Sequence, residues 1–176
     1  MKESLEIKIY PDPVLRKKSQ AIRQITDEEK RLIDYMTKTM YAARGIGLAA
    51  PQVGIAKRII VIDAGDGLLK MVNPRIITKK GTSLLEEGCL SIPEKEVEIQ
   101  RAEEISVLYT DEKNNRTTKS FKGLTARAIQ HEIDHLDGKL IIDYLPWFKR
   151  INEAITYGVK RCKLYGRIEG EVKCLQ

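Results

Sequence analysis

The stretch LTARAIQHEIDHLDG, residues 124–138, decides the fold of this 176-residue chain. It contains the chain's two histidines, His131 and His135, with Glu132 directly after the first. Apolar residues recur in it at helical spacing, and Gly138 stands where such a helix would end. We therefore predict an amphipathic helix over most of this stretch, and we expect its histidines to face an interior.

The spacing of the two histidines suits a metal ion. On an α-helix, positions i and i+4 lie on the same face, so both imidazoles can point at one cation. Glu132 lies about 100° further round the helix, where its carboxylate can reach a water molecule on that cation. Two nitrogen ligands beside one acid are the arrangement that metal-dependent hydrolysis uses. Histidines that are merely packed or solvated are the alternative, and we expect Asp134 and Asp137 to be solvated.

A useful metal site needs a third ligand, and the sequence offers three candidates. Glu153 lies 18 residues beyond the second histidine, a spacing that resembles zinc peptidases with a downstream glutamate ligand, and Asp143 is another carboxylate. Cys89 lies upstream, between Gly88, which permits close backbone approach, and Pro93. A thiolate is a strong, soft ligand for a divalent transition metal. The local chemistry therefore favours Cys89.

Three helices are predicted along the chain. Thr26 and Glu29 fit a capping box, apolar residues follow at helical spacing, and Gly45 is placed to end this first helix. The helix of the histidines extends from about Leu124 to Leu136, and a C-terminal helix is expected from about Trp147 to Lys163.

Strand patterns gather in the middle of the chain, and the pair Asn114-Asn115 between the last two predicts a hairpin turn. Because the strands cluster while the helices stand apart, we predict the α+β class, with mainly antiparallel sheets around a central helix carrying HEIDH and with a C-terminal helix. We expect residues 1–148 to form a single domain and 149–176 to form a helix and tail, packed on it or extending from it. The predicted strands are residues 58–63, 68–74, 95–101, 104–111 and 116–123.

The composition indicates a folded protein with room for a single core, since 42% of the residues are hydrophobic and 32% are charged. No apolar run approaches the roughly 20 residues of a membrane helix. Glu3 and Glu6 lie where a signal peptide would be apolar, so we expect a cytoplasmic protein. Three cysteines in such a protein argue against a disulfide framework. The formal charge of +6 permits a polyanionic partner without requiring one.

Three stretches together resemble the peptide deformylase family: GIGLAAPQ at 45–52, EGCLS at 87–91 and HEIDH at 131–135. They occur in that family's order, and PDPVLRKKS at 11–19 extends the similarity. It covers roughly residues 5–148, so the resemblance implies that the domain 1–148 is a catalytic deformylase domain. The tail after Trp147 matches the family least.

The resemblance implies a metal-dependent hydrolase that removes the formyl group from the N-terminal formylmethionine of nascent polypeptides and releases formate. The family's metal ligands fall on Cys89, His131 and His135. A metal-bound water is then the nucleophile, and Glu132 is the general base that turns acid. We expect one divalent metal ion, Fe²⁺ in the cell, with Zn²⁺, Ni²⁺ or Co²⁺ able to occupy the site.

Two donors are expected for the negative charge that builds on the formyl oxygen during the attack. Such charge needs hydrogen-bond donors that are already in place. The side-chain amide of Gln52 and the backbone N–H of Leu90 are the candidates, and we count both among the catalytic groups.

Five residues are expected to bind the substrate. By resemblance, Ile46 and Gly47 contact the peptide, while Glu87 and Leu124 border the methionine pocket. Gly47 leaves room for a peptide to pair with the backbone like an added strand. Arg127, near the pocket mouth, either pairs with an acid or meets the substrate, and the sequence does not choose. We also expect Glu87 to form a buried pair with Arg101 that braces the cysteine segment.

Two other functions are compatible with parts of the sequence. A zinc endopeptidase would use Glu153 as its third ligand. A non-catalytic metal- or RNA-binding protein would use the tail after Pro146, where seven Lys/Arg face three acids, to attract ribosomal RNA. The same tail suits an enzyme that visits the ribosome transiently. The expected partners are nascent formylmethionyl peptides, with neither DNA nor a membrane.

Overall fold

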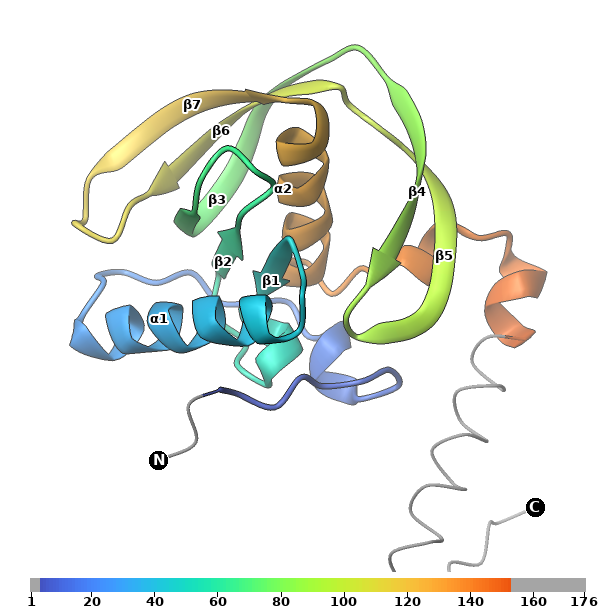
Figure 1. Ribbon diagram of the computed structural model, residues 1–176, viewed down its shortest axis with the longest axis horizontal. Helices are drawn as coiled ribbons and strands as arrows, with labels where there is room; N and C mark the ends of the chain where they lie inside the picture. Colours follow the sequence, from blue (N-terminus) through green and yellow to red (C-terminus); the bar gives the residue numbers. More distant parts are fainter. Residues whose placement is uncertain (1–3, 153–176) are drawn as a thin grey trace, which may run out of the picture.

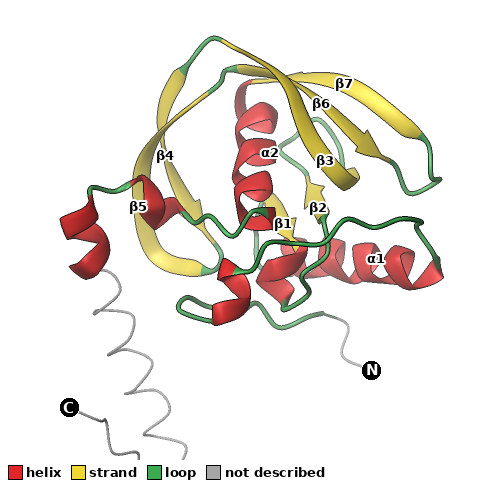
Figure 2. Cartoon of the chain, turned by 180° about the vertical axis from the view of Figure 1, so that it is seen from behind, coloured by secondary structure: helices red, strands yellow, loops and turns green. Residues whose placement is uncertain are grey.

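Antiparallel strands surround one central helix in the computed structural model, which describes residues 4–152 (Figure 1). This helix, α2 (Gly123–Leu136), carries both histidines. A five-stranded antiparallel sheet in the order β1-β2-β3-β6-β7 lies on one side of it, and a separate β4-β5 hairpin lies on the other (Figures 1 and 2). The predicted α+β class, with antiparallel sheets around the HEIDH helix, is confirmed. The strands are β1 (Gly47–Ala49), β2 (Ile59–Ile62), β3 (Leu69–Lys80), β4 (Ser83–Cys89), β5 (Ile92–Arg101), β6 (Glu104–Thr110) and β7 (Arg116–Lys122).

The first long helix, α1 (Asp27–Ala42), starts as the sequence predicts and ends differently. Thr26 and Glu29 form the predicted capping box. At the other end, Arg44 and not Gly45 adopts the left-handed conformation, with φ of 54°. The N–H of Arg44 bonds to the Tyr41 carbonyl (3.0 Å) and that of Gly45 to the Met40 carbonyl (2.9 Å), which satisfies the last carbonyls of the helix. Three short 3-10 helices are also present: η1 (Pro13–Arg16), η2 (Ala50–Val53) and η3 (Ile141–Tyr144).

Two strands differ from the sequence prediction. β3 does not stop at Pro74 but continues to Lys80, because a register shift between Val72 and Arg75 lets the proline sit where no ladder hydrogen bond is required. β4, Ser83–Cys89, was not predicted at all. It forms by pairing with β5, from Ser83↔Arg101 onward.

Two asparagines hold the segment that leads into α1. The side chain of Asn73 accepts from the N–H of Ile22 (2.9 Å) and donates to its carbonyl (2.7 Å). Asn114, in the predicted β6–β7 turn, does the same with Ile25 (3.0 and 3.1 Å). Each amide therefore pairs with the backbone of one residue as a neighbouring strand would.

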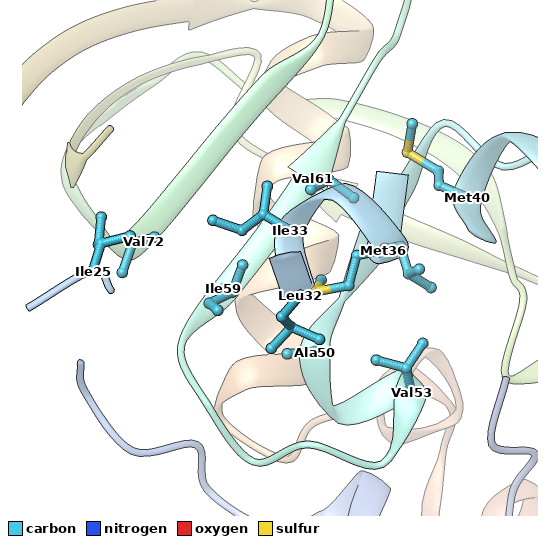
Figure 3. Close-up of a cluster of buried hydrophobic side chains, with 11 residues drawn as sticks. Ile25, Leu32, Ile33, Met36, Met40, Ala50, Val53, Ile59, Val61 and Val72 are labelled. Carbon is cyan, nitrogen blue, oxygen red and sulfur yellow. The ribbon is translucent and has the colours of Figure 1, made fainter. Parts of the chain in front are cut away.

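The β2 strand contributes to two hydrophobic clusters because its side chains alternate between the faces of the sheet. Ile59 and Val61 pack against α1 in the cluster that Figure 3 shows. Ile60 and Ile62 pack in a second cluster that includes Ile129 and Leu136 of α2. Full burial of such a side chain stabilises the fold by about 1.5–3 kcal/mol. A third cluster joins β5 to η1 and η3 and contains Leu15, Ile92, Val97, Ile99, Leu140, Ile141 and Ile142.

The end of α2 is fixed by close packing. Gly138 has φ of 74°, and a Cβ built on it would lie 2.6 Å from the Arg16 carbonyl oxygen, so this predicted helix stop also requires glycine. Residues 147–152 are helical, where the predicted C-terminal helix begins; the rest of that helix lies outside the described residues. Within residues 4–152, no helix combines the length and the apolar character that crossing a membrane would require.

The capping box predicts how stability depends on pH. Hydrogen bonds from Lys57 (2.7 Å) and Thr26 lower the pKa of Glu29 from 4.5 to about 2. The carboxylate therefore stabilises the fold above pH 4.5, and this contribution is lost as the pH falls toward 2. Glu29→Gln keeps a capping-box side chain without the charge. Its free energy of unfolding, measured by denaturant titration, should fall less than that of the wild type across this range.

The control for this experiment is Glu28→Gln, which removes an exposed carboxylate that contacts the same Lys57 (3.0 Å). It should follow the wild type. Equal pH dependence of Glu29→Gln and the wild type would contradict the prediction.

Candidate metal centre and cavity

The structure brings the three predicted metal ligands together. Cys89 lies at the end of β4, and His131 and His135 lie on α2. Their ligand atoms are all within 4.8 Å of one another, and Cys89 Sγ lies 3.2 Å from His135 Nε2. Among the described residues, this is the group of three or more Cys, His, Asp and Glu side chains that converges closely enough to hold one ion.

A change of register at the end of β4 sets the position of Cys89. β4 pairs with β5 regularly from Ser83 to Gly88, then the register shifts and Cys89 pairs with Ile92. Such an irregularity bends a strand and re-aims its side chains. It occurs directly before Cys89, whose sulfur lies against His135 of α2.

Of the other two candidate ligands, Asp143 does not join this group. Asp143 Oδ2 forms an ion pair with Arg16 and accepts a hydrogen bond from the N–H of Leu140 (2.8 Å). Glu153 lies outside the described residues.

Glu87 connects the hairpin to the helix. Its carboxylate accepts hydrogen bonds from Arg101 Nε (2.7 Å) and Nη2 (2.9 Å), and from Arg127 Nη1 (2.6 Å). It also lies 3.0 Å from His131 Nδ1, which leaves His131 Nε2 as the nitrogen for a metal. Although burial raises the pKa of Glu87, the interactions with His131 and Arg101 outweigh it and lower the pKa to about 2. The predicted buried Glu87–Arg101 pair is present.

Arg127 pairs with an acid, the first of its two predicted alternatives. Besides Glu87, its guanidinium donates to the Ile99 carbonyl (3.0 Å) and to the Ser83 carbonyl (2.7 Å) and hydroxyl (2.8 Å). These bonds occupy both terminal nitrogens within the protein. A contact between Arg127 and the substrate remains a prediction.

Asp134 is not free in solvent, and the expectation that it is solvated was wrong. Its Oδ2 accepts hydrogen bonds from Arg101 Nη1 (2.8 Å) and from the Tyr144 hydroxyl (2.7 Å). Asp134 thus holds the same arginine that holds Glu87. Asp137, in contrast, is exposed, although it forms an ion pair with Arg58 (2.7 Å).

Glu132 is buried beside the cluster with one oxygen available. It is 4% exposed, and its Oε2 has no hydrogen-bond partner among the described residues. Burial raises its pKa from 4.5 to about 7, which lets the group exchange a proton near neutral pH. A Cβ built on Gly47 would clash with Glu132 Oε1, so the acid occupies space that a larger residue at position 47 would remove.

The two imidazoles have different environments. Burial and the neighbouring cations lower the pKa of His135 well below 6.5, so this ring is neutral, as a metal ligand must be. Burial also opposes the charged form of His131. There, however, the interactions with Cys89 and Glu87 prevail and raise the pKa.

Gln52 is held in one orientation by the backbone. Its Oε1 accepts a hydrogen bond from the N–H of Ala49 (2.7 Å), which directs the Nε2 group toward Cys89 Sγ at 3.7 Å. This residue lies in η2 and is 1% exposed. The predicted donor therefore lies beside the ligand cluster with its N–H groups facing it. Leu90, the other predicted donor, directly follows Cys89.

A cavity of about 420 Å³ opens over the cluster. The structure places all five predicted substrate residues in its wall, and the side chains of Ile46 and Leu124 are exposed there. Sequence analysis did not single out Arg44 and Glu86, which also border this cavity. No local pattern marks them, because α1 and β4 bring them to the opening. The predicted lining residues are Ile46, Gly47, Glu87, Leu124 and Arg127.

These residues fit a divalent transition metal. One soft thiolate and two imidazole nitrogens suit such an ion, and three protein ligands leave a position for a reacting molecule. The carboxylate of Glu87 against His131 Nδ1 is the kind of contact that orients a metal-binding histidine. The arrangement can support metal-assisted hydrolysis of a substrate in the cavity.

Comparison with known proteins shows which family this chain resembles. The pattern that defines the Polypeptide deformylase family matches residues 4–150. A peptide deformylase from Thermodesulfovibrio yellowstonii is 48% identical over 151 residues, covering 83% of this chain and 92% of the relative. One from Endomicrobium trichonymphae is 47% identical over 165 residues, covering 92% of this chain and 97% of the relative.

Solved structures agree with this comparison. A peptide deformylase from Synechococcus elongatus in complex with actinonin is 41% identical, with a TM-score of 0.81, covering 89% of this chain and 86% of that one. A peptide deformylase from Ehrlichia chaffeensis in complex with actinonin is 35% identical, with a TM-score of 0.85, covering 89% and 97%.

The buried ion pairs generate a prediction about stability. Glu87→Gln leaves Arg101 and Arg127 buried without their shared carboxylate, so the free energy of unfolding should fall by about 3–5 kcal/mol in a denaturant titration. Glu86→Gln, which changes the neighbouring exposed carboxylate, is the control and should cost little.

A double-mutant cycle with Arg101→Gln, measured on metal retention, tests whether the Glu87–Arg101 pair braces the segment that carries Cys89. No coupling in that cycle would rule the role out.

Proposed function

The chain belongs to the polypeptide deformylase family and hydrolyses the formyl group from formylmethionyl nascent peptides, and on this premise we propose which of its residues perform each step. The observation that carries the assignment is the convergence of Cys89, His131 and His135 beside the buried Glu132, under a cavity. No other group of described residues offers ligands and a proton carrier together.

Cys89, His131 and His135 would hold the metal on which enzymes of this family depend. We propose iron(II) as the ion in the cell, with zinc, nickel or cobalt able to replace it, because a thiolate with two imidazoles suits all of these metals. When bound, the ion polarises the formyl carbonyl and lowers the pKa of a water molecule.

Glu132 would move the protons of the reaction. With a pKa of about 7 and one oxygen without a partner, it can take a proton from water and later deliver it to the nitrogen of methionine. In this hydrolysis a bond forms between the water oxygen and the formyl carbon, and the C–N bond breaks. The products are formate and a free amino terminus.

Gln52 and Leu90 would stabilise the oxygen that gains negative charge. The Nε2 group of Gln52 is already aimed at the cluster by its bond to Ala49, so it need not reorganise during the reaction. The backbone N–H of Leu90 lies next to the thiolate ligand. We propose both as donors to the formyl oxygen.

The substrate would enter along the wall formed by Ile46 and Gly47. The exposed apolar side chains of Ile46 and Leu124 suit the methionine side chain. Glu87 and Arg127 would line the pocket as an ion pair, so their charges neutralise each other and leave the pocket suited to an apolar side chain. We also propose that actinonin, present in two of the similar structures, binds in this cavity.

Residues 1–148 would form the catalytic domain of an enzyme that works in the cytoplasm, where nascent chains emerge.

The basic segment 149–176 is proposed as an addition that contacts the ribosome transiently. Deleting residues 150–176 should then weaken ribosome co-sedimentation while formate release from a short peptide continues.

Metal content and activity separate the roles of the individual residues. After anaerobic purification, Cys89→Ala should lose the metal, because one of three ligands is missing, and should lose formate release from a formyl-Met peptide. Glu132→Gln should keep the metal and lose about 10²–10⁴ in kcat, the usual contribution of a positioned acid–base group. Glu153→Ala is the control and should spare both. Metal loss in Glu153→Ala with retention in Cys89→Ala would instead support an endopeptidase.

Replacement of Gln52 tests the proposed oxyanion donor. Gln52→Ala removes the Nε2 group and should cost on the order of 2.7–4 kcal/mol of transition-state stabilisation. The loss should appear in kcat for the formyl-Met peptide, with metal content unchanged. An unchanged kcat would remove Gln52 from the mechanism.

A further inference from the structure

A second and larger cavity lies along another face of α2. It is an open groove of about 860 Å³. It is lined by β3 from Pro74 onward, by the end of β5, and by Gln130, Ile133 and Asp134 of α2. Figure 2 shows how these three elements are arranged. None of the proposed catalytic steps uses this groove.

One edge of β3 is unpaired along the groove. The pairing of β3 with β2 ends at Val72↔Ile59, whereas its pairing with β6 continues to Lys80↔Glu104. In an antiparallel pair, every second residue turns its N–H and C=O away from the partner strand. Residues 75–80 therefore present roughly 20 Å of backbone donors and acceptors, to which none of the described residues bonds.

Arg58 defines where this free edge begins. Its Nη2 donates to the Pro74 carbonyl (3.3 Å), while its Nη1 forms an ion pair with Asp137 (2.7 Å). The Pro74 carbonyl, two residues beyond the last pair with β2, is thereby satisfied. A segment that pairs with β3 would start at Arg75.

The charges of the groove divide into occupied and free groups. At the end of β5, Arg101 is held by Glu87 and Asp134 and is 6% exposed. Along the strand, Arg75, Lys79 and Lys80 are exposed and form no ion pair with any residue between 4 and 152. Lys139, which also lines the groove, is half-buried with its Nζ 3.7 Å from the Tyr144 ring. The exposed cations without an ion pair in this groove are therefore those of β3.

We propose that this groove binds an acidic polypeptide segment in extended conformation, which adds to β3 as a further strand. The backbone of residues 75–80 supplies the hydrogen bonds of strand addition. Arg75, Lys79 and Lys80 supply the complementary charge, which favours carboxylates in the added strand over basic or neutral ones. The inference goes beyond the deformylase reaction and does not depend on it.

The groove fits a peptide better than a nucleic acid. Single-stranded RNA is bound mainly by stacking of its bases on aromatic side chains. The aromatic residue of this groove is Tyr144, and its ring already lies 3.7 Å from Lys139 Nζ and 5.2 Å from Arg101 Cζ. Its hydroxyl donates to Asp134. No stacking platform remains along the charged edge.

Binding of a synthetic strand tests the proposal on the full-length, metal-loaded enzyme. The probe is a fluorescein-labelled decapeptide of alternating Glu and Thr, followed by fluorescence anisotropy. We expect saturable binding, with slower amide hydrogen exchange confined to β3 residues 75–80. Lys79→Glu with Lys80→Glu should raise Kd by about tenfold or more. A peptide N-methylated at alternate residues should not bind, because it lacks the N–H groups that pair with β3.

Lys113→Glu with Lys119→Glu is the matched control, since it changes the net charge equally on residues outside the groove. It should leave Kd near the wild-type value. Formate release should be unchanged in both double variants, so a failure of the deformylase assignment would be seen separately. Equal weakening by the two variants, unchanged exchange at 75–80, or tighter binding of a ten-nucleotide single-stranded RNA would each overturn the proposal.

Discussion

The carboxylate of Glu87 on β4 accepts hydrogen bonds from Arg101 on β5 and Arg127 on α2, and it lies against the ring of His131. A buried charge costs several kcal/mol unless it is paired, and here each charge is paired at short distance. The hairpin is thereby fixed against the helix. Cys89 lies only two residues further along β4, so the same contacts determine whether its sulfur reaches the histidines.

The network that begins at this carboxylate extends through the helix to its other face. Arg101 also bonds to Asp134, which accepts from the Tyr144 hydroxyl on η3. Arg101 lines the groove along β3, and it also holds Glu87, which lines the catalytic cavity. The guanidinium of Arg101 donates to Glu87 and Asp134, so its charge is neutralised within the protein and is not available to a ligand in either cavity. Proton transfer in the catalytic cavity is therefore left to Glu132. The positive charge of the groove comes from the exposed cations at the edge of β3.

The helix of the histidines could be predicted because its signals are local: apolar periodicity, two ligands one turn apart and a glycine stop. Cys89 could be predicted from chemical identity. β4 could not, since Leu84 and Leu85 are adjacent and both exposed, and the strand forms only through its pairing with β5. The bonding of Arg127 depends on an acid 40 residues away, so the sequence could state the alternatives but not choose.

Asn73 and Asn114 each use both ends of one amide against the backbone that precedes α1. An amide presents a donor and an acceptor side by side, and a carboxylate presents two acceptors. Deamidation of Asn114 would replace the amide nitrogen with a charged oxygen and set a negative charge against the Ile25 carbonyl oxygen. Chemical ageing at Asn114 would therefore loosen the approach to the first helix while every residue of the catalytic cavity stayed intact.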